Sequence, residues 1–320
     1  MKRASQSTIV VVRSANQRSI SGANQRFVRG ANNDYQTARS EYLRLMVIGM
    51  VLTCAFSSGC RPSTPEGLSL AEVKDYAAAE VQIERLRKQK DSPTDWAAIE
   101  QQLQITRPMV KDIDAAFGLT YEEEIAAALR KCKSGERPKV HQQVLAKGLQ
   151  HVTVAAIGRE LDAMAKASGA ERSAAAARIS ALFEGIRPTF VRRDSDYFSG
   201  EKALEPAADA ALEQLKSAAE SGEIFGPRKS LEEAIARTYA LCVLYEIEEI
   251  EKLREKDLAA CDVKRMEAVI FYRIIEDRIR RFAPDADATI SAILDAGYDK
   301  MDVPLLVANL RNGLPGIPLK

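Results

Sequence analysis

Aromatic residues are scarce in this chain, and histidine is nearly absent. Aromatics make up 6% of the 320 residues, and there are only two histidines. Neither histidine has a glutamate three positions before it, which the di-metal sites of helical bundles require. Nucleophile elbows, phosphate-binding glycine loops and dinucleotide fingerprints are missing as well. The sequence therefore contains no recognisable catalytic constellation, and we expect neither a metal site nor a cofactor.

Excess positive charge is missing from most of the chain. Residues 1–59 hold 8 basic and 2 acidic residues, whereas the remainder holds 38 basic and 43 acidic ones. The body of the protein therefore carries a net charge of −5 beneath an overall +1. Because nucleic-acid binding needs a basic footprint, this balance argues against nucleic acid as a partner.

The chain has an apolar segment that is too short to cross a membrane. The uncharged stretch from Leu45 to Phe56 would rise about 18 Å as a helix, against a hydrocarbon core of about 30 Å. Arg39 and Arg44 supply a positive flank before it. This layout predicts the apolar region of a secretory signal.

The residues that follow, Ser57-Ser58-Gly59-Cys60, resemble the lipobox of bacterial lipoproteins. In that family a small residue precedes the cysteine that becomes the lipidated amino terminus, and here Ser57 stands where leucine is usual. The resemblance implies that Cys60 is lipidated and that the protein is anchored to a membrane of the cell envelope. Arg61, in place of an aspartate, implies the outer membrane, facing the periplasm, in a Gram-negative cell. The alternative is a buried apolar helix with an incidental cysteine, but the polar, proline-rich residues 61–67 favour a tether.

Residues 1–42 contain a small repeat, seen in Ala15-Asn16-Gln17-Arg18 and Ala23-Asn24-Gln25-Arg26, with little apolar periodicity. Either translation starts later, at a codon such as that for Val28 or Leu43, or the chain has a long basic leader. We therefore divide the chain into a leader region 1–59, of which 1–42 is untranslated in the first alternative, a lipidated tether 60–68 and a helical domain 69–320.

Helix signals recur throughout the domain, and strand signals do not. We expect helices over about 69–90, 92–116, 120–133, 138–166, 170–186, 204–219, 230–256, 262–282, 288–296 and 303–312. Capping boxes are predicted at Ser69, Thr120 and Ser230, and further caps at Ser92 and Asp287. Pro108 predicts a kink or break, and residues 188–200 resemble a loop. The fold class is therefore all-α, either one antiparallel helical bundle or two side by side.

Two stretches about 90 residues apart are similar, beginning at Ser134 and at Ser221. They suggest an internal duplication with halves 69–190 and 200–320. Helices of similar composition also align by chance, so both explanations stay open.

Three cysteines remain after Cys60. Cys242 lies in the stretch Tyr239 to Tyr245, which is apolar on every side, and we expect it in the core of a central helix. Cys132 and Cys261 could pair in an oxidising compartment or remain free thiols, because geometry decides this. The two histidines, His141 and His151, are about 15 Å apart along one predicted helix and cannot share a metal ion.

Three charged residues are candidates for ligand binding. Glu246 has Cys242, Val243 and Ile250 as helical neighbours, so it is expected to be partly buried, with a raised pKa or an arginine partner from a facing helix. The alternative is that Glu246 is one of several charged residues that form ion pairs along a helix face. Arg273 and Arg278 belong to a cluster near a helix end, where they complement the helix dipole or receive an acidic ligand or lipid headgroup.

The function that these features favour is a non-catalytic binding or scaffold module, anchored by lipid in the cell envelope. Its partners would be the membrane and an envelope protein. The alternative is a small-molecule or metal-binding uptake component with a pocket between helices. An enzyme would be the third class.

Overall fold

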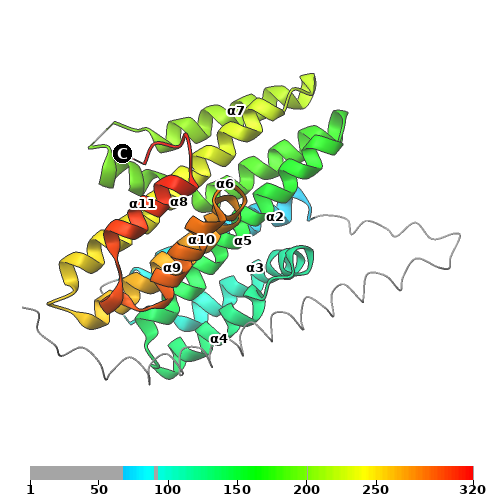
Figure 1. The fold of residues 1–320 in the computed structure, drawn as a ribbon. Coiled ribbons are helices and arrows are strands. Elements are labelled where there is room, and N and C mark those ends of the chain that lie inside the picture. Colours follow the sequence, from blue (N-terminus) through cyan, green and yellow to red (C-terminus); the bar gives the residue numbers. More distant parts are fainter. Residues whose placement is uncertain (1–67, 90–92, 200, 320) are drawn as a thin grey trace, which may run out of the picture. The chain divides into compact units, whose positions relative to one another are not determined.

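The structure, a computed structural model, describes residues 68–89, 93–199 and 201–319, whose regular elements are all helices (Figure 1). This confirms the all-α fold class. The leader, Cys60 and most of the tether lie outside the described residues. The helices are α2 (Leu70–Arg87), α3 (Trp96–Phe117), α4 (Tyr121–Ser134), α5 (Pro138–Lys166), α6 (Gly169–Tyr197), α7 (Leu204–Ser221), α8 (Phe225–Leu253), α9 (Leu258–Phe282), α10 (Pro284–Asp295) and α11 (Val303–Gly313), with a 3₁₀ turn at Tyr298–Lys300.

Local signals place several helix ends correctly. The capping box at Ser69 is confirmed, since the Glu72 N–H donates to Ser69 Oγ (3.3 Å) and the Ser69 N–H donates to Glu72 Oε2 (2.8 Å). Helix α5 has the predicted bounds, beginning at Pro138, whose missing N–H costs nothing in a first turn.

The other predicted side-chain caps are wrong. Helix α3 is capped by Asp95, which accepts from the Ala98 N–H (2.9 Å), and Ser92 lies outside the described residues. Thr120 is the N-cap residue of α4, as predicted, but it makes no cap bond to the backbone, so the capping box there is wrong. Ser230 lies inside α8, where its hydroxyl donates to the Gly226 carbonyl (3.1 Å). Asp287 lies inside α10 and accepts from the Tyr272 hydroxyl (2.6 Å).

Caps for two helices come instead from a neighbouring helix. Asp114, in the last turn of α3, accepts from the N–H groups of Tyr121 (3.0 Å) and Glu122 (2.7 Å) at the start of α4. Asp194 of α6 likewise accepts from three N–H groups that begin α7. These bonds satisfy orphan donors of the first turn.

Neither internal proline ends its helix. Pro108 lies within α3 and Pro188 within α6. The predicted loop over 188–200 is therefore wrong, because α6 continues to Tyr197. An interior proline costs about 3 kcal/mol. Here the residues beyond it offset that cost, because Phe190 is fully buried and Asp194 caps the next helix.

Two long antiparallel pairs form the centre of the bundle. Helix α5 pairs with α6 and α8 pairs with α9, and α5 packs against α9 (Figure 1). Helices α3 and α4 pack against α5, α7 packs against α6 and α8, and α10 and α11 pack against α9. Helix α2 lies against α6 and α3. The all-round apolar stretch of α8 is in the core as expected, with residues 239–243 buried.

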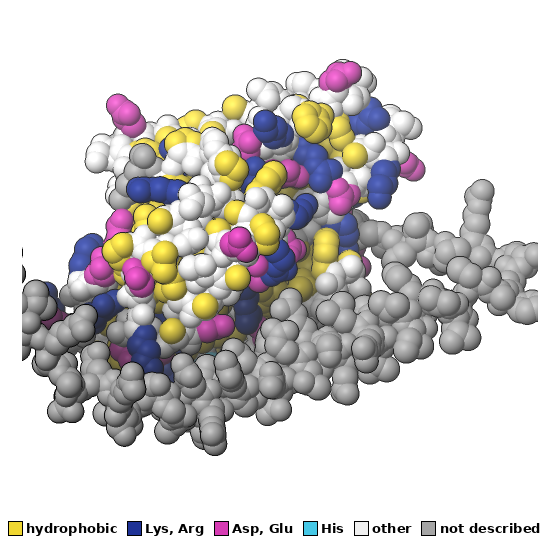
Figure 2. All heavy atoms as spheres, viewed as in Figure 1, with side chains coloured by type: hydrophobic (Ala, Val, Ile, Leu, Met, Phe, Trp, Pro, Cys, Tyr) yellow, Lys and Arg dark blue, Asp and Glu magenta, His cyan; other side chains and the backbone are white. Residues whose placement is uncertain are grey.

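The contacts join Gly67–Lys320 into one compact unit. The internal duplication stays a prediction. None of the described helices is both long and apolar enough to cross a membrane. On the face seen in Figure 2, basic and acidic side chains are interspersed among hydrophobic ones.

Candidate functional site

Glu246 is 3% exposed and faces α9. Its Oε2 accepts from Lys264 Nζ at 2.7 Å, and the same ammonium donates to Glu267 Oε2 at 3.2 Å. The partner is thus a lysine, not the arginine that was one of the sequence alternatives. Burial, reinforced by the charge of Glu267, raises the pKa of Glu246. The two buried carboxyls and the half-buried lysine form a charge cluster between α8 and α9.

A second buried carboxyl, Glu80, lies where α2 packs against α5 and α6. Its Oε2 accepts from Thr153 Oγ1 at 2.6 Å. Burial raises the pKa of Glu80 to about 7, and the Thr153 bond opposes that rise only in part. The carboxyl fits there because Gly185 has no side chain, since a Cβ at that position would lie 2.5 Å from Glu80 Oε2. Glu80 is thus a buried carboxyl held within a contact between helices.

Lys147 acts electrostatically on both Glu80 and Glu267. It is buried, its Nζ is 3.9 Å from Glu84 Oε1, and it lies 5.2 Å from the centroid of the Phe271 ring. Burial lowers its pKa. Neither Glu80 nor Lys147 was found from sequence, because an isolated charge on a helix is usually solvated. The position of Lys147 beside Leu145 and Leu149 in an apolar stripe is the signal that could have found it.

Arg273 and Arg278 do not join Glu246. Arg273 donates to Glu124 Oε2 on α4 (3.1 Å), and Arg278 lies 3.9 Å from Glu233 Oε1 on α8. They follow Lys264, the partner of Glu246, by about 14 Å and 21 Å along α9. The three predicted candidates therefore have separate partners and form no common site.

The described residues also form no metal site and no disulfide. No group of three or more His, Cys, Asp or Glu residues there could hold a metal ion. His151 contacts the Tyr121 hydroxyl, and burial lowers the pKa of the imidazole to about 4. Cys132, Cys242 and Cys261 are buried free thiols.

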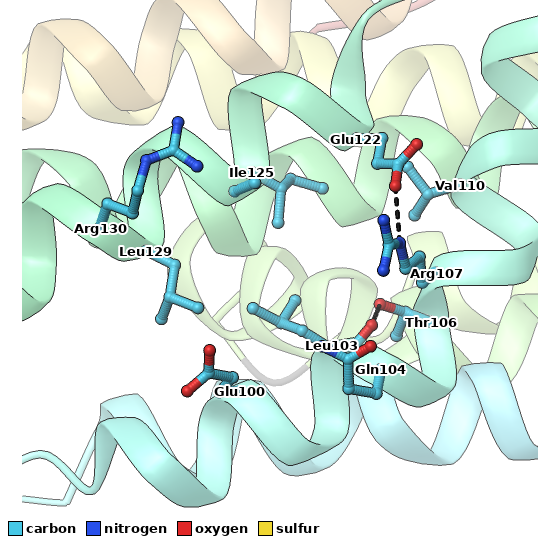
Figure 3. A pocket seen from close by; sticks show the side chains of 11 residues that line it. Glu100, Leu103, Gln104, Thr106, Arg107, Val110, Glu122, Ile125, Leu129 and Arg130 are labelled. Carbon is cyan, nitrogen blue, oxygen red and sulfur yellow. Dashed lines mark hydrogen bonds and ion pairs between the residues drawn. The ribbon is translucent and has the colours of Figure 1, made fainter.

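A pocket of about 350 Å³ lies between α3 and α4 (Figure 3). Its apolar lining consists of Leu103 and Val110 from α3 and Ile125, Ala126 and Leu129 from α4. In Figure 3 the α4 side chains lie across the hollow from Leu103. The volume falls within the range of about 300–1,000 Å³ found for small-molecule sites. The hollow can accept an apolar body of modest size.

Charged residues surround this apolar lining. At one end Arg107 Nε donates to Glu122 Oε1 (2.6 Å), which joins α3 to α4 across the pocket (Figure 3). Glu100 is paired with Lys133 (2.9 Å). Arg130 has no hydrogen-bond or ion-pair partner among the residues that the structure describes. The rim therefore offers one uncommitted guanidinium, which suits an anionic group on a ligand.

Sequence patterns did not identify this pocket, because its two walls come from helices that meet only in the tertiary structure. Comparison of the chain with protein-family models, with curated proteins and with solved structures gives no match.

Proposed function

We propose that the protein is a non-catalytic binding module of the cell envelope, anchored by lipid at Cys60, and that it binds a small ligand in the α3–α4 pocket. The observation that carries the binding role is the pocket itself, with its apolar lining and charged rim. It favours the small-molecule form of the proposal over a scaffold that uses flat helix faces.

The ligand that fits is an amphiphile with an apolar body and an anionic end. Leu103, Ile125 and Leu129 would contact the body, and Arg130 would pair with the anion. An arginine is suited to carboxylate, sulfonate or phosphate groups because its donors form a planar fork. The paired Arg107 and Glu122 would close the other end.

Filling the pocket is expected to abolish binding of 1-anilinonaphthalene-8-sulfonate, a fluorescent amphiphile of this chemistry. Ala126 lines the pocket, so Ala126→Trp places an indole where the ligand would lie. We expect the affinity, measured by fluorescence titration, to fall at least about tenfold, equivalent to about 1.4 kcal/mol.

The matched control is Ala127→Trp, on the same helix and also half-buried, but outside the pocket lining. It should bind the probe as the unaltered protein does. Equal affinities for both variants, each with an unchanged melting temperature, would show that the probe binds elsewhere and would sink the pocket assignment.

The anchor is tested separately, by intact mass and membrane fractionation of protein made in a bacterial host. We expect a chain that begins at Cys60 and carries the mass of two or three acyl chains, because a single chain anchors a protein only marginally. Cys60→Ala should lose both the processing and the membrane association. A whole, unacylated chain in the cytosolic fraction would contradict the envelope location.

A further inference from the structure

Three phenylalanines of the described chain are unusually exposed. Phe225 is 79% exposed, Phe282 64% and Phe117 49%. Exposed aromatic rings are costly in water, and several at one place mark an interaction surface. Their positions along the bundle decide whether they form one surface.

Phe225 and Phe282 lie at the same end of the bundle. Helices α8 and α9 are antiparallel, since Glu233 contacts Arg278 and, further along α8, Glu246 contacts Lys264. Phe225 begins α8 and Phe282 ends α9. Their levels along the pair therefore differ by only about one helical turn.

Phe117, the last residue of α3, lies close to the turn that brings Tyr121 against His151, near the middle of α5. It is therefore not part of the same surface. Helix α5 itself finishes at the end that holds Phe225 and Phe282, because Arg228, in the first turn of α8, pairs with Asp162 (2.8 Å). We call this end, with Phe225 and Phe282, the phenylalanine end.

The phenylalanine end is also where the chain enters the bundle. Tyr76, near the start of α2, contacts Thr153 (3.1 Å), whereas Glu84, near its last turn, faces Lys147. Helix α2 therefore runs opposite to α5 and begins toward the end at which α5 finishes. Leu70 follows Cys60 by ten positions, a length of chain that spans at most about 35 Å. A lipid on Cys60 would hold this end close to a bilayer.

Charges at the phenylalanine end are of both signs. Lys166 and Arg281 have no carboxylate partner among the described residues, and Glu171 and Glu223 at the same end have no basic one. Such a surface needs no partner of opposite net charge. A bilayer interface, which accepts aromatic rings below zwitterionic or weakly charged headgroups, meets this requirement.

We propose that the phenylalanine end rests on the lipid bilayer, with Phe225 and Phe282 inserted among the headgroups. This inference rests on the lipid anchor of the proposed function. It adds an orientation, in which the phenylalanine end of α8 and α9 contacts the membrane and the loop between these two helices lies at the far end.

The test uses tryptophan as a depth probe in the full-length, acylated protein. Trp96 is the only tryptophan, so a Trp96→Phe background is free of other signal. Phe225→Trp in this background is the probe. Leu258→Trp is its matched control, because Leu258 is 57% exposed and begins α9, about 36 Å from Phe282 along the helix. The vesicles contain phosphatidylethanolamine and phosphatidylglycerol with brominated acyl chains, which quench tryptophan only at short range.

We expect the vesicles to quench the Phe225→Trp protein at least about twofold and to leave the Leu258→Trp protein nearly unchanged, since interfacial insertion reaches about 5–10 Å. Equal quenching of the two acylated proteins, or none in either, would overturn the orientation while the anchor stands. A concentration-dependent blue shift of the Phe225→Trp emission without vesicles would also overturn it, by indicating a second copy at this end.

The two proposals can be distinguished if the purified protein carries no acyl mass. The anchor then fails, and vesicle quenching of the Phe225→Trp protein would still support insertion. Absence of quenching in that unacylated protein would overturn insertion too.

Discussion

Replacing Phe190 by alanine is expected to lower the free energy of unfolding by about 3–5 kcal/mol. Phe190 is fully buried and meets Phe183 edge-to-face, with 4.9 Å between ring centroids. Truncation removes that contact and leaves a cavity which the surrounding helices fill only in part. Chemical denaturation followed by circular dichroism measures the change.

Val191→Ala provides the control on the next residue of α6. Val191 is 42% exposed, so its truncation should change stability by no more than about 0.5 kcal/mol. The contrast between the two neighbours is what a helix with one buried face predicts. Small, equal losses would indicate a solvated loop after Pro188 and would contradict the course of α6.

The change that Glu80→Gln makes in the free energy of unfolding is expected to be more favourable at pH 8 than at pH 4.5, by about 3 kcal/mol. The basis is the buried carboxyl of Glu80, whose pKa rises from an ordinary 4.5 to about 7. Each pKa unit corresponds to about 1.4 kcal/mol. Glutamine keeps an acceptor for the Thr153 hydroxyl and cannot ionise.

The direction follows from the proton balance. Below pH 4.5 Glu80 is protonated in the folded and the unfolded chain, and its contribution to stability is fully present. Between pH 4.5 and about 7 the unfolded chain has released the proton and the folded chain retains it, so stability falls as pH rises. Above about pH 7 this loss of stability is complete. The Glu80→Gln variant does not lose stability in this way, because glutamine does not ionise.

His151 acts in the opposite direction, which determines how the experiment is designed. Burial lowers its pKa to about 4, so its contribution rises with pH between about 4 and 6.5. Both proteins contain His151, and its effect cancels when the free energies of unfolding are subtracted at each pH. A difference that stays constant from pH 4.5 to 8 would show that Glu80 is not held protonated in the fold.

The candidate residues were only partly accessible to sequence reasoning. Glu246 was identified because its helical neighbours are apolar, and it is indeed buried. The sequence predicts a cluster that contains Arg273 and Arg278, but side chains on one helix can face different neighbours, and theirs are Glu124 and Glu233. The sequence does not predict the pocket, because Leu103 and Ile125 each resemble ordinary core residues of separate helices.

What the sequence by itself determined is the helical class and those helix ends that depend on adjacent residues. Composition favours helix, the bond between Ser69 and Glu72 spans three positions, and Pro138 constrains its own backbone. What only the tertiary structure decided depends on groups far apart in the chain. Helix α6 passes Pro188 because the bundle buries Phe190, α4 is capped by Asp114 of α3, and the pocket exists only where those two helices meet. Local hydrogen bonds act within one turn, whereas burial depends on every helix that covers the site.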